Sequence, residues 1–104
     1  MGLLSFLGGK KNKIKDALKR GAIIVDVRTG IEYDNGHLPD AFNIPVDRIR
    51  SSAGRLKETN KPVIVCCNGS DRSAQAVQSL KEKGLKEVYN GGHWEDLLRI
   101  LQSI

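Results

Sequence analysis

The sequence contains few aromatic residues, only two cysteines and no long apolar run. Aromatic residues make up 5% of the chain, which argues against a nucleic-acid surface that stacks bases on aromatic rings. No apolar stretch approaches the ~20 residues that a transmembrane helix needs. With 104 residues, the chain is long enough for one domain with a single core and too short for two.

The two cysteines are adjacent, at Cys66 and Cys67. Neighbouring cysteines can pair only through a strained ring, so a secreted disulfide framework is excluded. With His37 and His93 they make a nominal set of four zinc-ligand residues, but the spacing is not that of a zinc site, and we expect no metal. Free thiols are typical of a reducing compartment, so the sequence favours a cytoplasmic protein.

Positive charge is concentrated near the N-terminus. Residues 1–20 hold six basic residues and one acidic residue, which accounts for the whole net charge of +5. No basic stripe crosses the rest of the chain, so we expect no nucleic-acid partner. We divide the chain into a basic N-terminal tail, residues 1–12, and a single domain, residues 13–104. The apolar Met1–Gly9 is interpreted as a loose extension, with weak membrane-surface or partner docking as the alternative.

Helix and strand patterns alternate along the domain. Continuous β-branched runs at Ala22–Val27 and Pro62–Cys67 are typical of strands buried on both faces. Shorter strands are expected at Phe42–Ile44 and Lys86–Tyr89. Helices are expected at Lys13–Arg20, Thr29–Asn35, Arg48–Glu58, Asp71–Lys83 and from Trp94 to Leu101. This alternation predicts an α/β domain with a parallel sheet between helices, and a ligand site at the carboxyl ends of the strands.

The segment after the second long strand is the candidate site. Cys67 ends that strand, and a short loop then enters a helix through Asn68, Gly69, Ser70, Asp71, Arg72 and Ser73. A helix N-terminus and successive backbone N–H groups both favour an anion, and the thiolate is the reactive form of cysteine. The residues alone leave two interpretations open: Cys67 is a nucleophile in an anion-binding loop, or both cysteines are small apolar residues that end a strand.

Further motifs follow one another at separate places along the chain. They are Asp26-Val27-Arg28, Glu32-Tyr33, Gly36-His37-Leu38-Pro39, Ala41-Phe42-Asn43-Ile44-Pro45, the loop from Cys67 to Ser73, and Tyr89-Asn90-Gly91-Gly92 with Trp94. In this order the motifs resemble the rhodanese-like domain family in its short, single-domain bacterial form. The resemblance covers the chain from Lys13 to Leu101. It implies an α/β fold with a parallel five-stranded sheet flanked by helices on both faces.

The resemblance also implies an activity, that of a transferase resembling thiosulfate sulfurtransferase (rhodanese). A sulfane sulfur from a small anionic donor would move to Cys67 as a persulfide, and then to a thiophilic acceptor such as another protein. Cys67 would be catalytic, and the substrate-binding cradle would consist of Asn68, Gly69, Ser70, Asp71, Arg72 and Ser73. A monomer without a cofactor is expected.

Three features depart from the family pattern. Asn68 stands where a basic residue is common, Asp71 adds a negative charge beside Arg72, and Cys66 stands where an aromatic residue is common. Asp71 predicts weaker binding of a dianion such as thiosulfate. Because Cys66 belongs to the strand, we expect its side chain to be buried and to point away from Cys67.

Two other functions stay open. Counted from Cys66, the same loop reads Cys-x5-Arg, the pattern of phosphatases and arsenate reductases related in fold, although no histidine stands directly before Cys66. The second alternative is a rhodanese-like binding module that is not catalytic.

Side chains outside the loop have structural explanations. Asp26, Arg28 and Glu32 are expected to hold the end of the first strand to the following helix, His37 to bond backbone, and Trp94 to belong to the core.

Overall fold

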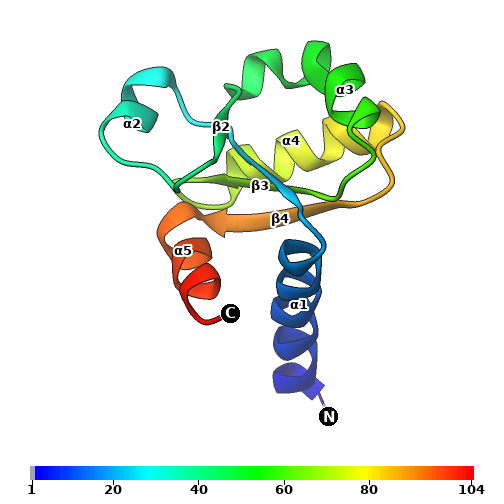
Figure 1. Cartoon of the computed structure of the whole chain (residues 1–104), viewed down its shortest axis with the longest axis vertical. Helices are drawn as coiled ribbons and strands as arrows, with labels where there is room; N and C mark the ends of the chain where they lie inside the picture. The colour runs from blue at the N-terminus through cyan, green and yellow to red at the C-terminus, as the bar shows by residue number, and fades with distance from the viewer. Residues whose placement is uncertain (1) are drawn as a thin grey trace.

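Four parallel strands form the centre of the protein, and helices cover both faces of the sheet (Figure 1). The computed structural model describes residues 2–104, with side chains from Gly9 onward. The strand order is β2-β1-β3-β4, and every neighbouring pair is parallel. The strands are β1 (Ile23–Asp26), β2 (Phe42–Asn43), β3 (Val63–Cys67) and β4 (Val88–His93). The helices are α1 (Gly2–Lys19), α2 (Gly30–Asp34), the 3-10 helix η1 (Val46–Arg48), α3 (Ile49–Glu58), α4 (Asp71–Glu82) and α5 (Trp94–Gln102).

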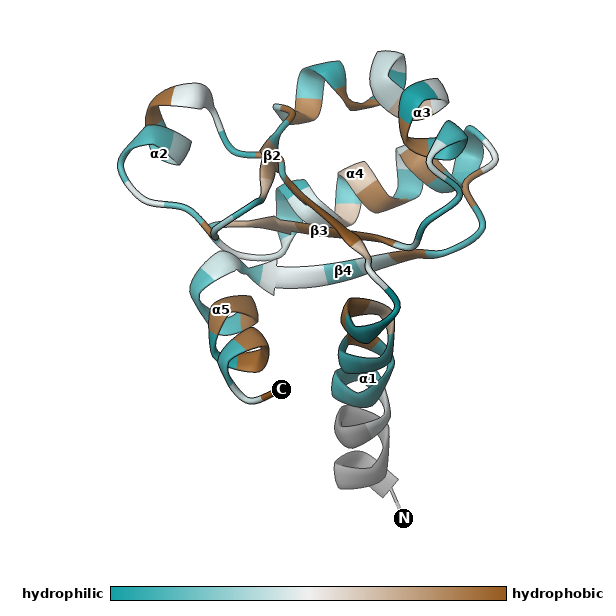
Figure 2. Ribbon diagram, in the orientation of Figure 1, coloured by the Kyte–Doolittle hydropathy of each residue, from teal (hydrophilic) through white to brown (hydrophobic). Residues whose placement is uncertain are grey.

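Strand side chains alternate between two apolar layers, because successive residues of a strand point to opposite faces. Val65 and Cys67 pack in the layer that contains buried residues of α3 and α4. Ile64 and Cys66 pack in the layer that contains α1 and α5. Figure 1 shows these two helix pairs on opposite sides of the sheet, and Figure 2 shows the hydrophobic colour along β1 and β3 between them. The expectation that Cys66 is buried and points away from Cys67 is confirmed.

The expected five-stranded sheet is wrong in one respect, since residues 2–104 contain four strands. The residues before β1 form α1, which contains most of the predicted helix Lys13–Arg20. Ile14 and Ala17 stand at helical spacing, and both are buried in the layer that contains α5. Within the described residues, the outer edge of β4 therefore pairs with no other strand.

Helix α1 begins at Gly2, well before the predicted start at Lys13, so the backbone of segment 1–12 is helical from Gly2 onward. The side chains of residues 1–8 lie outside the described part of the structure, and surface docking by Met1–Gly9 stays a prediction. No described helix is both long enough and apolar enough to span a membrane.

The last strand contains a bulge at Gly91. Val65 pairs with Asn90 and Cys66 pairs with Gly92, so Gly91 is the extra residue on β4. A Cβ atom at Gly91 would lie 2.9 Å from Ile64 Cγ2 and 3.2 Å from the backbone oxygen of Val65. Only glycine therefore fits at this position. After the bulge, β4 continues to His93, whereas the predicted strand ends at Tyr89.

We expect Gly91→Ala to lower the free energy of unfolding by roughly 1–3 kcal/mol, because the added methyl group meets the core and a backbone atom. The control is Gly54→Ala in α3, where nothing lies within 4 Å of the new Cβ atom. Removing a helical glycine should raise the free energy of unfolding by about 0.5–1 kcal/mol. Urea denaturation of both variants tests this, and equal stabilities would contradict the close contact at Gly91.

Candidate active site

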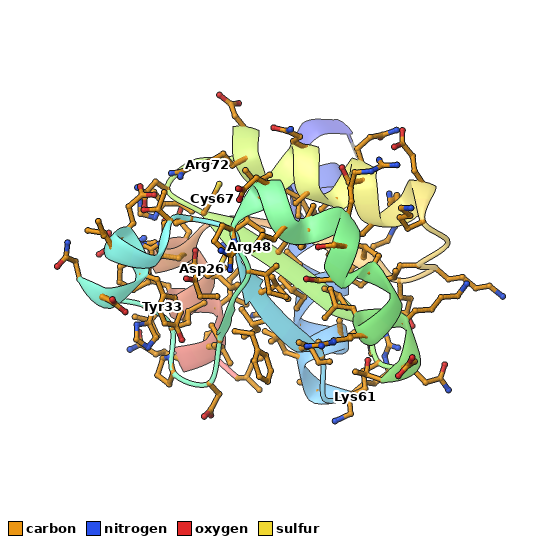
Figure 3. The ribbon with its side chains drawn as sticks, turned by 90° about the horizontal axis from the view of Figure 1, so that it is seen from above. Asp26, Tyr33, Arg48, Lys61, Cys67 and Arg72 are labelled. Atoms are coloured by element: carbon orange, nitrogen blue, oxygen red, sulfur yellow. The ribbon has the colours of Figure 1, made fainter. Side chains whose placement is uncertain are left out.

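The candidate site lies at the edge of the sheet where the parallel strands end. Cys67 is the last residue of β3, Asn68, Gly69 and Ser70 form an exposed loop, and α4 begins at Asp71. Figure 3 shows Cys67 and Arg72 close to one another at this edge. The side chain of Cys67 is only 1% exposed, so a reactant has to enter the loop to reach the sulfur.

The Cys67 thiol begins a short chain of hydrogen bonds. Its Sγ donates to Ser73 Oγ at 3.3 Å, and Ser73 is fully buried. Ser73 Oγ lies 2.7 Å from Asn90 Oδ1 and 3.1 Å from the Ser70 carbonyl oxygen. Asn90 Oδ1 also accepts from Gly92 N–H at 2.9 Å, which couples the chain to the bulge. Once Cys67 loses its proton, the Ser73 hydroxyl is able to turn and donate to the sulfur.

The backbone around Cys67 carries unused donors. Among the described residues, no backbone N–H from Asn68 through Ser73 donates to a protein acceptor. The first N–H of α4 with a partner is that of Ala74, which donates to the Ser70 carbonyl at 2.8 Å. Unpaired N–H groups and the positive end of a helix dipole together favour an anion. The chemistry available at this loop is therefore the stabilisation of negative charge on or beside a sulfur atom.

Cys66 has a different environment from Cys67. It is fully buried on the α1 and α5 side of the sheet. Burial, followed by the nearby charge of Asp26, raises the pKa of the Cys66 thiol to about 12. Cys66 therefore stays protonated near neutral pH, and the Cys-x5-Arg register, which needs a reactive Cys66 in the loop, is disfavoured.

A buried ion pair connects β1 to the loop. Arg28 Nη2 lies 2.6 Å from Asp26 Oδ2, and both side chains are less than 5% exposed. The same guanidinium donates to the carbonyl oxygens of Gly36, at 2.7 Å, and Glu32, at 3.3 Å, and contacts Asn68 Oδ1 at 3.4 Å. The guanidinium carbon Cζ of Arg28 lies 5.0 Å from the ring centroid of Trp94, which is a cation–π contact. The predicted structural role of Asp26 and Arg28 is confirmed, and it extends to the loop.

Glu32, in α2, holds the loop through hydrogen bonds from Arg72 and Asn68. Its carboxylate accepts from Arg72 Nη1 at 2.7 Å, Arg72 Nη2 at 3.0 Å and Asn68 Nδ2 at 2.7 Å. It also accepts from Thr29 N–H at 2.9 Å and closes the capping box of α2. The Arg72 hydrogen bonds, followed by that from Thr29, lower the pKa of Glu32 to about 2. Arg72 is therefore paired with Glu32, which neutralises its charge beside the loop.

The two histidines have local partners. His37 is exposed, and its Nδ1 lies 2.8 Å from the Tyr33 carbonyl oxygen, so the predicted backbone contact is confirmed. His93 Nδ1 accepts from Glu95 N–H at 3.2 Å and caps α5. In the part of the chain that the structure describes, no group of three or more histidine, cysteine or acidic residues is placed to hold a metal.

The sequence analysis named Asn90 and Glu32 but missed the contacts that these two residues make at the site. Asn90 positions Ser73, and Glu32 pairs with Arg72 across the loop. Asn90 carried a weak signal, being a polar residue directly before Gly91-Gly92. The pairing of Glu32 with Arg72 had none, since the two residues are far apart in sequence and meet only because α2 lies against the loop.

One hollow of the surface lies away from Cys67. It has a volume of about 400 Å³ and is lined by residues at and after the C-terminal ends of α3 and α4, Lys61 and Lys86 among them. Lysines are favourable beside helix C-termini because the dipole leaves partial negative charge there. This explains the lysines without a ligand, and the hollow contributes nothing to the Cys67 site.

We expect Glu32→Gln to weaken the contact between α2 and the loop, because it removes the negative charge that pairs with Arg72. Since the folded-state pKa of about 2 lies below the ordinary 4.5, the contribution of Glu32 is present above pH 4.5 and is lost as the pH falls toward 2. The difference in unfolding free energy between wild type and Glu32→Gln should therefore shrink over that range. Urea denaturation at a series of pH values tests this, with the exposed Glu58→Gln as control. A constant difference across the range would contradict the assignment.

A family model for the Rhodanese-like domain matches residues 10–95. "Thiosulfate sulfurtransferase PspE" of Escherichia coli is 34% identical over 74 residues, which cover 70% of this chain and 71% of that protein. "Uncharacterized protein YqhL" of Bacillus subtilis is 38% identical over 71 residues, which cover 68% of this chain and 56% of that protein. The chain thus spans little more than half the length of YqhL.

A solved structure described as a rhodanese with anions from E. coli agrees with the fold. It superposes with a TM-score of 0.67 at 32% identity, and the match covers 73% of this chain and 91% of that chain. The alternation of strands and helices, the loop that follows Cys67 and the family match all agree: the chain belongs to the rhodanese-like domain family, a family that includes thiosulfate sulfurtransferases.

Proposed function

We propose that the protein transfers a sulfane sulfur from an anionic donor to a thiophilic acceptor through a persulfide on Cys67. The observation that carries this proposal is the row of unpaired backbone N–H groups from Asn68 to Ser73 around one buried thiol. A sulfur that alternates between thiolate and persulfide needs a partner for its negative charge in both forms. A cradle of fixed N–H dipoles supplies that partner without moving a side chain.

The reaction consists of two displacements. The Cys67 thiolate attacks the outer sulfur of thiosulfate, a sulfur–sulfur bond forms to Cys67, and the original bond breaks as sulfite leaves with its electron pair. A nucleophile such as cyanide or a thiolate then attacks the terminal sulfur of the persulfide. The Cys67 sulfur leaves as thiolate, and the starting state is restored. Both steps balance without a metal or redox cofactor.

Each part of the site has a role in this scheme. In the thiol form, Ser73 Oγ accepts from Cys67 and donates its one proton to Asn90 Oδ1. In the proposed anionic forms, that hydroxyl turns from Asn90 and donates to the sulfur, while Asn90 Oδ1 keeps its hydrogen bond from Gly92 N–H. Glu32 and Arg28 fix Asn68 from two sides, which keeps the loop in one shape for both steps. The names of relatives such as thiosulfate sulfurtransferase PspE support thiosulfate as a donor. A protein acceptor and a cytoplasmic location stay part of the proposal.

We expect Cys67→Ala to abolish sulfur transfer and Cys66→Ala to keep most of it, because only Cys67 lies in the loop. The assay is the transfer of sulfur from thiosulfate to cyanide, monitored by the formation of thiocyanate. Hydrolysis of a small aryl phosphate is measured on the same samples. Loss of activity in folded Cys66→Ala alone would overturn the Cys67 assignment. Phosphatase activity without sulfur transfer would favour the other register, and neither activity would favour a binding module.

We expect Asp71→Asn to raise the catalytic efficiency with thiosulfate, because it removes an exposed negative charge at the loop. The gain should be about two- to fivefold at low ionic strength, mainly through a lower KM, and should decline with salt. The exposed Asp34→Asn in α2 is the charge-matched control. An unchanged efficiency of Asp71→Asn at low salt would refute the electrostatic explanation of donor binding.

A further inference from the structure

We propose that Arg48 is the residue that selects anionic sulfur donors at the mouth of the site. The inference deepens the proposed sulfur transfer and depends on it. It assigns donor recognition to η1, a segment outside the persulfide loop. It begins from the charges around Cys67, which leave the loop without an available cation.

Both arginines next to Cys67 are neutralised by carboxylates. Arg28 is paired with Asp26 in the buried ion pair, and Arg72 is paired with Glu32 through two hydrogen bonds. The exposed Asp71 adds a negative charge at the start of α4. The loop therefore offers backbone N–H groups to a sulfur atom, but no free positive charge to an approaching dianion.

Arg48 is a cation of a different kind. It is exposed, and among the described residues its guanidinium makes no hydrogen bond and no ion pair. Its backbone is nevertheless held in place. Arg48 N–H donates to the Pro45 carbonyl at 2.8 Å, and the Arg48 carbonyl accepts from Ser51 Oγ at 2.9 Å. A long, unpaired arginine on a fixed backbone is suited to meet a mobile anion.

The fold brings η1 to the same edge of the sheet as Cys67. Val46 N–H donates to the Val27 carbonyl at 3.1 Å, and Val27 N–H donates to the Cys66 carbonyl at 3.0 Å. Val46 and Cys67 belong to one apolar cluster, and η1 packs against α4. Figure 3 shows Arg48 between Cys67 and Asp26 when the molecule is seen from above. These contacts place the backbone of η1 at the sheet edge where Cys67 ends β3. The proposal takes the Arg48 side chain to reach toward the loop from there.

At this position Arg48 acts before the sulfur transfer itself. A thiosulfate ion places its outer sulfur against Cys67 and the loop N–H groups, while its charged sulfonate end stays toward solvent. Arg48 balances part of that charge and raises the local concentration of the donor. After sulfite has left, the sulfonate end is gone and the remaining charge lies on the persulfide inside the loop, so Arg48 contributes little to the discharge of the persulfide.

The test compares Arg48→Gln with Arg55→Gln. Arg55 is an equally exposed arginine of α3 that lies by the hollow beside Phe42 and Ile44, so both variants lose one charge. The rate of persulfide formation on Cys67 is measured with thiosulfate, a dianion, and with methanethiosulfonate, a monoanion that releases sulfinate by the same displacement. Discharge of the preformed persulfide to cyanide is measured separately.

At low ionic strength, Arg48→Gln should lower the second-order rate of loading from thiosulfate by about three- to tenfold, while Arg55→Gln changes it less than twofold. The loss should be smaller with methanethiosulfonate, should fade at high salt, and should be largely restored by Arg48→Lys. Discharge to cyanide, a monoanion, should fall by less than twofold. Equal rates for the two variants, or equal losses with both donors, would overturn the proposal. If the wild-type protein is loaded by neither donor, the sulfur-transfer function itself fails.

Discussion

A buried ion pair between Asp26 and Arg28 organises the carboxyl edge of the sheet. One guanidinium contacts the Asp26 carboxylate, two backbone carbonyls around α2, the Asn68 side chain and the face of Trp94. Removing one partner of such a pair leaves an unpaired buried charge, which typically costs about 3–5 kcal/mol. The positions of α2, of α5 and of the loop after Cys67 therefore depend on this contact.

A second feature of this edge is that Arg28 and Arg72 are each paired with a carboxylate. Neither arginine therefore offers a free positive charge to the loop, and the exposed Asp71 adds a negative one. In the proposed sulfur transfer, the backbone N–H groups of the loop and Ser73 would stabilise the anionic sulfur. Backbone dipoles are fixed by the fold and need no reorganisation when charge moves from a donor to Cys67 and on to an acceptor. Recognition of the donor is then separate from the transfer step and is assigned to Arg48.

The sequence predicted those parts of the fold that depend on local pattern. The β-branched runs located β1 and β3, the helical spacing from Trp94 to Leu101 located α5, and strand alternation placed the two cysteines on opposite faces. The expected fifth strand came from the family resemblance alone, since the residue pattern located four strands. Strand β2 is only two residues long and is defined by its pairing with β1. Its length could therefore not be predicted from the sequence alone.

The position of the candidate loop at the end of β3 was predictable from the sequence, but the ion pairs around it were not. A cysteine at the end of a buried strand, followed by a short loop and a helix, pointed to Cys67 and the residues up to Ser73. The neutralisation of Arg72 depends on Glu32, which approaches the loop only after α2 has packed. The bulge at Gly91 and the contact of Asn90 with Ser73 likewise depend on close packing between β4, Ile64 and Leu97. Such contacts between distant residues leave no periodic pattern in a sequence.

The central claim is that Cys67 alone carries the transferred sulfur. Mass spectrometry of the protein after incubation with thiosulfate tests it most directly, with fragmentation between residues 66 and 67 to separate the two thiols. The account predicts a mass increase of one sulfur atom on Cys67, removed by cyanide, with Cys66 unmodified. A protein that gains no sulfur, or gains it on Cys66, would contradict the account.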